Sequence, residues 1–179
     1  MEFSTSYQSR EEEIIALFTA TFTASEGAAE GALIGGLVRN ILTSAAHEDL
    51  HVFTTRDNGA IIAAAIFTRM RYSGDPRTVF ILSPMAVAPE HQRKGIGQAL
   101  IIDALAVLRA GGVDVAVTYG DPAYYAKVGF QPVSIDTMPT PLPLTWPHGW
   151  LAQSLTGQPL KPMAGRSECI EALHDARYW

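Results

Sequence analysis

Cysteine is nearly absent from this 179-residue sequence, since Cys169 is the only one. A single cysteine excludes a disulfide within the chain and a cysteine-rich zinc site. We expect a cytoplasmic location, because so little cysteine is typical of proteins in a reducing compartment. We also expect no metal site, because metal-ligand spacing is missing among the five histidines, which stand at positions 47, 51, 91, 148 and 174.

Long apolar runs and blocks of basic residues are missing as well. No stretch approaches the roughly 18 consecutive apolar residues of a membrane span. The first residues, MEFSTSYQSREEE, lack the apolar core of a signal peptide. Lysine and arginine number 13 against 18 aspartate and glutamate residues, which gives a net charge of −5. This charge disfavours non-specific nucleic-acid binding and mildly favours an amine ligand, so we expect neither a membrane nor a nucleic acid as partner.

Apolar residues are what the sequence has in quantity: 47% of residues are hydrophobic and 17% are charged. This balance indicates a compact globular protein, and the length suits one domain with a sizeable core. We therefore expect a single domain over residues 1–179, with its regular core in about residues 5–133. Prolines become frequent from Ser134, and we expect residues 134–179 to form an extension packed on that core, with a strand at Trp150–Leu155.

The most informative stretch is Thr78–Ala110, where an apolar run leads through a basic turn into a helical pattern. The run Val79–Ala88 predicts a buried strand. Pro84 places that strand at an edge or a bulge, because proline offers no donor to the ladder. Apolar residues at helical spacing from Ile96 to Leu108 predict a helix that ends at the following glycine pair.

The turn between strand and helix has the features of an anion site. Glycines at 95 and 97 let an anion approach the backbone closely. The N–H groups of the first helical turn and the positive end of the helix dipole favour negative charge. Arg93 and Lys94 add positive charge at the same place. The expected ligand is therefore a phosphate or a pyrophosphate.

Other glycine motifs fit this turn less well. The phosphate-binding P-loop G-x-x-x-x-G-K-[ST] is absent from the chain. The dinucleotide motif G-x-G-x-x-G fails at Leu100, which takes the place of the third glycine, although Asp114 lies near the spacing of a ribose-binding acid. A glycine turn without any ligand stays open, but it leaves the basic pair unexplained.

Two motifs resemble those of one family. The pattern Val87-x-Pro89-x-x-Gln92-x-x-Gly95-x-Gly97 resembles the acyl-CoA pyrophosphate loop of the GNAT superfamily, the CoA-dependent N-acetyltransferases. The segment Tyr119–Phe130 contains GDPAYY and resembles the family's aromatic-Tyr-x-x-x-Gly-Phe turn, in a form similar to a bacterial branch of predicted acetyltransferases. The two motifs follow each other in the family's order.

The resemblance implies the GNAT fold, an α/β (α+β) architecture with a mixed, mostly antiparallel sheet flanked by helices. The remaining patterns agree with that order of elements. The dipeptide Asn58-Gly59 predicts a tight hairpin, and Ser9 with Glu12 predicts a capping box for the first helix. We expect helices at 9–24 and 29–43, and strands at 50–55, 60–72, 113–118 and 130–133.

The resemblance also implies acetyl-CoA as cosubstrate and gives individual residues roles. The pantetheine arm would bond to the backbone of the motif strand as an added strand does, at Met85, Ala86 and Val87. The pyrophosphate would be held by the loop residues Gln92, Arg93, Lys94, Gly95, Ile96, Gly97 and Gln98. Tyr125 matches the general acid that protonates the departing thiolate. Because the strand carries no carboxylate, Ser83 is our candidate for positioning a water that deprotonates the amine.

One position departs from the family's pattern, since Gly120 stands where many relatives carry an asparagine that contacts CoA, which puts that contact in doubt. Glu26 and Glu30 are either contacts for the amine or solvated charges at helix ends.

We expect an N-acetyltransferase that moves an acetyl group from acetyl-CoA to a primary amine of a small molecule or a peptide by direct attack. A non-catalytic acyl-CoA-binding regulatory module and an interaction domain centred on the proline-rich tail stay open. A homodimer is also compatible with the sequence.

Overall fold

The computed structural model describes residues 1–179, which divide into two compact units. The first unit contains Met1–Phe67 and Pro84–Ala104, and the second contains Thr68–Ser83 and Leu105–Trp179. Three elements run from one unit into the other: strand β3 (Ala60–Tyr72), strand β4 (Asp75–Val87) and helix α3 (Ile96–Ala110). None of the helices combines the length and the apolar character that a membrane span needs.

The first unit contains the strand order β1-β2-β3-β4. The short strand β1 (Glu2–Ser4) pairs antiparallel with β2 (Leu50–Asp57). Between β2 and β3, Asn58 has φ +48° and Gly59 has φ +83°, so the predicted two-residue hairpin is confirmed. Sequence analysis missed β1, because three residues are too few to show an alternating pattern.

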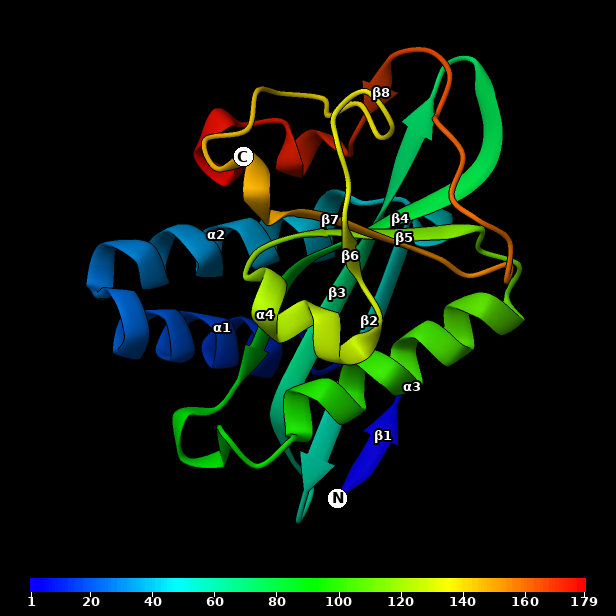
Figure 1. Cartoon of the computed structure of the whole chain (residues 1–179). Coiled ribbons are helices and arrows are strands. Elements are labelled where there is room, and N and C mark those ends of the chain that lie inside the picture. Colours follow the sequence, from blue (N-terminus) through cyan, green and yellow to red (C-terminus); the bar gives the residue numbers. More distant parts are fainter. The chain divides into compact units, whose positions relative to one another are not determined.

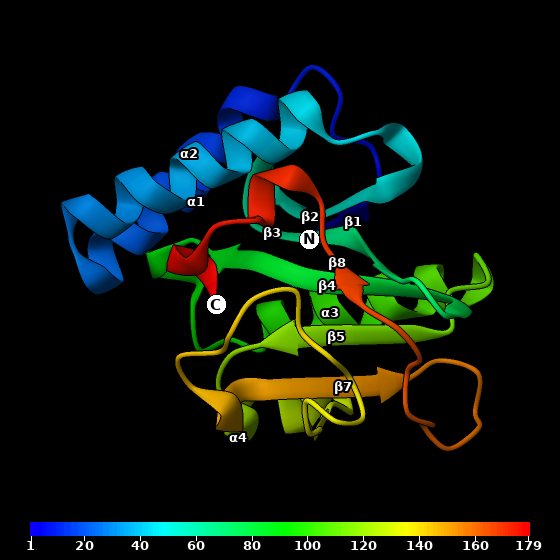
Figure 2. The ribbon, with the colours of Figure 1, turned by 90° about the horizontal axis from the view of Figure 1, so that it is seen from above.

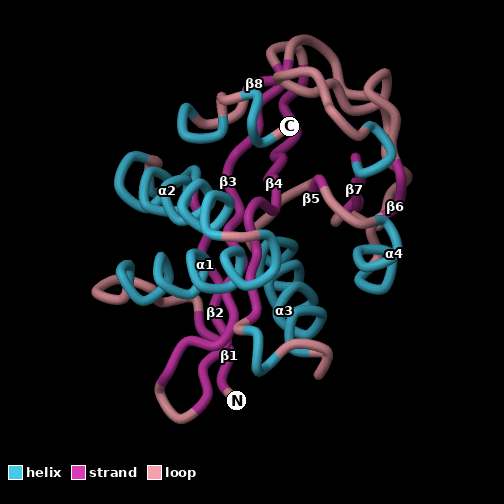
Figure 3. The backbone as a smooth tube through the Cα atoms, turned by 90° about the vertical axis from the view of Figure 1, so that its left-hand side faces the viewer, coloured by secondary structure: helices cyan, strands magenta, loops and turns pink.

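A pair of helices, α1 (Glu11–Glu26) and α2 (Ala28–Ser44), lies side by side in this unit (Figure 1, Figure 3). Gly31 and Gly35 of α2 face threonine side chains of α1. A methyl group on Gly31 would also lie 2.7 Å from the carbonyl oxygen of Thr19. The glycines weaken the helix locally, but they let the two helices approach closely.

The predicted capping box at the start of α1 is wrong. The helix begins at Glu11 without a side-chain cap, and Ser9 has φ +68° outside it. Glu12, the second member of the expected box, accepts two hydrogen bonds of 2.6 and 2.9 Å from the guanidinium of Arg39 on α2. A tertiary partner therefore takes the carboxylate that the local motif assigned to the cap.

The second unit contains a mixed sheet in which β4, β5 and β7 lie side by side (Figure 2). Strand β4 pairs in parallel with β5, from Val79–Val115 to Leu82–Thr118. The neighbouring pairs of β7 with β5 and with β6 are antiparallel, as is the pair of β8 with β3. The residue ranges of these strands are β5 (Val115–Tyr119), β6 (Gln131–Pro132), β7 (Trp150–Ser154) and β8 (Ser167–Glu168).

The segment expected to pack on the core as an extension contributes a strand to the sheet itself. Strand β7 lies between β5 and β6 and pairs with β5 along its whole length. The predicted strand at Trp150–Leu155 is confirmed to within one residue. Trp150 is 1% exposed, and its indole N–H donates to the carbonyl oxygen of Met138 at 2.9 Å. A large side chain from the proline-rich segment therefore belongs to the core of this unit.

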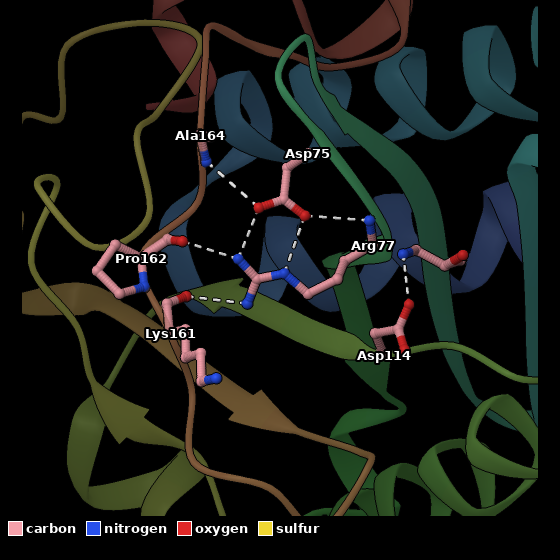
Figure 4. Close-up of polar contacts among 7 residues, drawn as sticks. Asp75, Arg77, Asp114, Lys161, Pro162 and Ala164 are labelled. Carbon is pink, nitrogen blue, oxygen red and sulfur yellow. Dashed lines mark hydrogen bonds and ion pairs between the residues drawn. The ribbon is translucent and has the colours of Figure 1, made fainter.

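An ion pair at the start of β4 holds part of the proline-rich segment (Figure 4). The guanidinium of Arg77 donates to both carboxylate oxygens of Asp75, at 2.9 and 2.7 Å. It also donates to the carbonyl oxygens of Lys161 and Pro162, at 2.9 and 2.8 Å. The hydrogen bonds from Arg77 outweigh burial and lower the pKa of Asp75 to about 2.

Candidate active site

A basic loop joins β4 to α3 in the first unit, and two of its side chains bond to the loop's own backbone. The side-chain amide of Gln92 donates to the carbonyl oxygen of Val87 at 3.0 Å. The ammonium of Lys94 donates to the carbonyl oxygen of Glu90 at 2.8 Å. Both residues were predicted to bind the ligand. In the structure, their side chains hold the loop in shape through these two hydrogen bonds.

The same loop has a left-handed backbone at two positions and an exposed positive charge. Arg93 has φ +59° and Gly95 has φ +78°. The side chain of Arg93 is exposed, and no hydrogen bond or ion pair engages its guanidinium. A methyl group on Gly95 would meet no atom within 4 Å. The backbone angle therefore favours glycine here, and the space in front of it is open.

The start of α3 adds backbone donors to this loop. Its first hydrogen bond runs from the amide of Ala99 to the carbonyl of Gly95 at 3.0 Å. The amides of Ile96, Gly97 and Gln98 consequently have no acceptor within the helix. With Arg93 and the positive end of a 15-residue helix, they have the features of an anion site, and we call this group of residues the anion cradle. A hollow of about 260 Å³ adjoins the cradle.

The backbone predicted to bind pantetheine follows the part of β4 that pairs with β5. That parallel pairing ends at Leu82, and the predicted binding residues Met85–Val87 come after it. Pro84, which was expected at an edge or a bulge, also follows the stretch that pairs with β5. Ser83, the predicted water-positioning residue, is half-buried beside the last pair. The roles of these residues stay predictions.

The other predicted catalytic residue, Tyr125, belongs to the second unit. It is the last residue of the short helix α4 (Pro122–Tyr125), where the carboxylate of Asp121 accepts the amide of Ala123 at 2.9 Å. The chain leaves the following turn at Gly129, which has φ +97°. The predicted short helix that ends at a glycine is therefore confirmed.

The ring of Tyr125 is fixed on several sides. It packs edge-on against Tyr124 and Phe130, with ring centroids 5.1 and 5.8 Å away. A methyl group on Gly120 would lie 2.7 Å from Cε2 of Tyr125. The ring thus fills the space that a side chain at position 120 would need. This explains the glycine that stands in place of the family's asparagine.

The hydroxyl of Tyr125 interacts with a buried residue that sequence analysis missed. Thr118 on β5 is 0% exposed, and its hydroxyl donates to the carbonyl oxygen of Leu82 at 3.0 Å. Burial raises the pKa of Tyr125 to about 12, although a side-chain hydrogen bond with Thr118 acts to lower it. Tyr125 is therefore protonated throughout the neutral range and suits a donor. The signal for Thr118 was its hydroxyl among the apolar residues of the strand predicted at 113–118.

Asp114, which lies near the spacing of a ribose-binding acid, is hydrogen-bonded to the start of strand β4. Its carboxylate accepts the amide of Thr78 at 2.7 Å (Figure 4), and its own amide donates to the carbonyl of Thr78 at 2.9 Å. These bonds brace the start of the pairing between β4 and β5. The carboxylate therefore has a structural partner that accounts for its presence.

Comparison with known sequences and structures gives one consistent family. Residues 48–132 match the family model described as "Acetyltransferase (GNAT) domain". The chain is 35% identical over 121 residues to the uncharacterized N-acetyltransferase YjhQ of Escherichia coli, a match that covers 65% of this chain and 66% of YjhQ. It is 29% identical over 82 residues to the uncharacterized N-acetyltransferase YhbS of the same species, which covers 46% of this chain and 49% of YhbS.

Solved structures share the fold along nearly the whole chain. The structure of E. coli YhbS in complex with CoA has a TM-score of 0.78 at 22% identity, covering 97% of this chain and 92% of that one. A GNAT family acetyltransferase from Brucella melitensis in complex with acetyl-CoA has a TM-score of 0.75 at 21% identity, covering 96% and 97%. The predicted mixed α/β fold is confirmed, and the chain belongs to the GNAT acetyltransferase family.

Proposed function

We propose that this protein is an acetyl-CoA-dependent N-acetyltransferase that acts on a primary amine. The observation that carries the proposal is the anion cradle at the start of α3. There, the amides of residues 96–98 have no acceptor within the helix, the guanidinium of Arg93 is exposed, and the space in front of Gly95 is open. A CoA pyrophosphate suits this cradle in charge and shape. YhbS and the Brucella melitensis protein, which share the fold, were solved with CoA and acetyl-CoA.

The loop residues divide into those that would meet the anion and those that shape the cradle. The helical amides and Arg93 would meet the pyrophosphate oxygens directly. Gln92 and Lys94 would keep the loop in its binding conformation, since their polar ends already bond to loop carbonyls. The backbone of Met85–Val87 would hold the pantetheine amides in the manner of an added strand.

Bound acetyl-CoA would supply the acetyl thioester. Ser83 would hold the water that takes a proton from the amine, so that the amine nitrogen forms a bond to the acetyl carbon as the carbon–sulfur bond breaks. Tyr125 would give its hydroxyl proton to the departing sulfur and regain one from water. The proton lost by the amine is thus balanced by the proton gained by the thiol.

The positioning of Tyr125 favours an enzyme over a non-catalytic module. Binding of CoA alone would need the cradle and not a phenol held by two rings and a buried threonine. An ordered, protonated hydroxyl is what thiolate departure needs.

The test is amine-dependent thiol release from acetyl-CoA by the whole chain. The panel contains alkylamines, arylalkylamines, amino acids and peptides with free N-termini or lysines, with a no-amine control. We expect at least one amine to raise thiol release well above that control. Binding of acetyl-CoA without release by any amine would leave the non-catalytic module, and absence of binding would overturn both readings.

A further inference from the structure

A half-exposed tryptophan lies in the segment between β6 and β7. Trp146 has 47% of its surface exposed, which is unusual for the largest apolar side chain. Its backbone is held at both polar groups: its N–H donates to the hydroxyl of Tyr119 at 2.6 Å, and its carbonyl accepts the amide of Gly149 at 2.9 Å. The exposed ring is therefore carried by an ordered segment.

Two glycines place this ring relative to Tyr125. The amide of Gly120 donates to the carbonyl of Gly149 at 2.9 Å, so these two residues are in contact just beyond the last β5–β7 pair, Tyr119–Trp150. Because glycine has no Cβ atom, each residue leaves room for a neighbouring side chain at the position of its Cβ.

Each of those Cβ positions is occupied by a ring. A methyl group on Gly120 would lie 2.7 Å from Cε2 of Tyr125, and one on Gly149 would lie 2.6 Å from Cε3 of Trp146. The rings of Tyr125 and Trp146 consequently each contact one of two hydrogen-bonded glycines, at the end of the β5–β7 pair. The exposed indole is a neighbour of the residue to which we assign proton donation.

Three polar side chains near these rings already have partners. The hydroxyl of Tyr119 also bonds to the hydroxyl of Thr145 at 3.1 Å, and Thr145 donates to the carbonyl of Trp179 at 2.9 Å. The carboxylate of Asp121 accepts the amide that caps α4. What these rings offer a ligand is aromatic surface, which binds flat apolar groups by stacking or edge-to-face contact.

We propose that Trp146 forms a wall of the acceptor site and binds an aromatic group of the amine substrate. The inference rests on the proposed function, because it is the assignment of Tyr125 to the departing sulfur that places the reacting amine nearby. The substrate class it names is the arylalkylamine, in which a short alkyl linker separates the amine from the ring. The linker would span the distance between the reacting amine near Tyr125 and the indole of Trp146.

The test compares phenethylamine with propylamine, which has the same primary amine and no ring. The measured quantity is the ratio of kcat/KM for phenethylamine to that for propylamine. Trp146→Ala should lower this ratio at least tenfold, and Trp146→Phe should restore most of it. Ile135→Ala is the matched surface control, because Ile135 is a 56% exposed apolar residue of the same segment, and it should leave the ratio unchanged.

Binding measurements separate failure of this inference from failure of the proposed function. Saturation-transfer NMR of phenethylamine with the CoA-bound protein reports the subsite without turnover, and a titration with acetyl-CoA shows that each variant is folded. A ratio that is equal in wild type and Trp146→Ala overturns the subsite, and so does phenethylamine that neither binds nor reacts better than propylamine. Absence of acetyl-CoA binding to the wild type would instead overturn the proposed function.

Discussion

Replacement of Tyr125 by phenylalanine isolates the contribution of one hydroxyl. The ring would keep its contacts with Tyr124, Phe130 and Gly120, because these involve only ring atoms. The variant loses the hydrogen bond with Thr118 and the proton that we assign to the departing sulfur. We therefore expect a loss in kcat with little change in the affinity for acetyl-CoA.

The size of the loss follows from the acidity of the phenol. The pKa of Tyr125 is about 12, whereas an ordinary thiol has a pKa of about 8.5. Complete proton transfer to sulfur is therefore uphill, and general acid catalysis should fall at the low end of its usual range of about 10²–10⁴. We predict a roughly 100-fold drop in kcat, equivalent to about 2.7 kcal/mol of transition-state stabilisation.

The assay is thiol release at saturating acetyl-CoA and amine, paired with calorimetric measurement of acetyl-CoA binding. Because burial raises the pKa of Tyr125, its donor form should persist, and the wild-type rate should show no descending limb from this group between about pH 6 and pH 10. A kcat for Tyr125→Phe within twofold of wild type would refute the assignment. A loss confined to acetyl-CoA affinity would make Tyr125 a binding residue instead.

Three further substitutions test the surroundings of the site. Thr118→Val should lower kcat about tenfold by releasing the Tyr125 hydroxyl, Thr118→Ser should restore it, and the valine should add nothing in a Tyr125→Phe background. Gly120→Ala should displace the Tyr125 ring and lower kcat without changing acetyl-CoA affinity, and an unchanged kcat would contradict the close packing at Cε2. Arg77 is the main cause that lowers the pKa of Asp75 from 3.8 to about 2. The ionised carboxylate therefore contributes its full stabilisation of the folded state above the ordinary pKa, and this contribution is lost as the pH falls toward 2. Between pH 7 and pH 2.5, urea unfolding of the wild type should therefore lose about 1.5 kcal/mol more than Asp75→Asn does, and equal losses would contradict that shift.

Features with strong local signals could be predicted from the sequence. The turn at Asn58-Gly59 has its own backbone preference, which no distant contact needs to supply. The glycine-bearing turn before α3 is equally local, because its amides are left unpaired by the geometry of any helix start. Both were found at the predicted positions.

Features that depend on distant partners were missed or mistaken. Glu12 takes no part in the expected capping box, because its carboxylate forms a bidentate ion pair with Arg39, which lies far along the chain. Strand β7 enters the sheet because β5 has an open edge, and β5 ends 31 residues before β7 begins. The contact of Thr118 with Tyr125 depends on how a strand and a following helix fold together. Periodicity shows which face a residue occupies and leaves its partner unspecified.

The central claim is that the loop before α3 binds the pyrophosphate of acetyl-CoA. Its most direct test is a calorimetric titration of acetyl-CoA into the wild type, Gly95→Asn and Gly95→Asp. Asparagine and aspartate have the same size and both tolerate the left-handed backbone of Gly95, so the two variants differ in one negative charge. At about 5 Å, that charge repels a doubly charged pyrophosphate by about 1.7 kcal/mol even in bulk water. We predict that the aspartate variant binds acetyl-CoA at least tenfold more weakly than the asparagine variant. Equal affinities of the two variants, or a wild type that does not bind acetyl-CoA, would contradict the account.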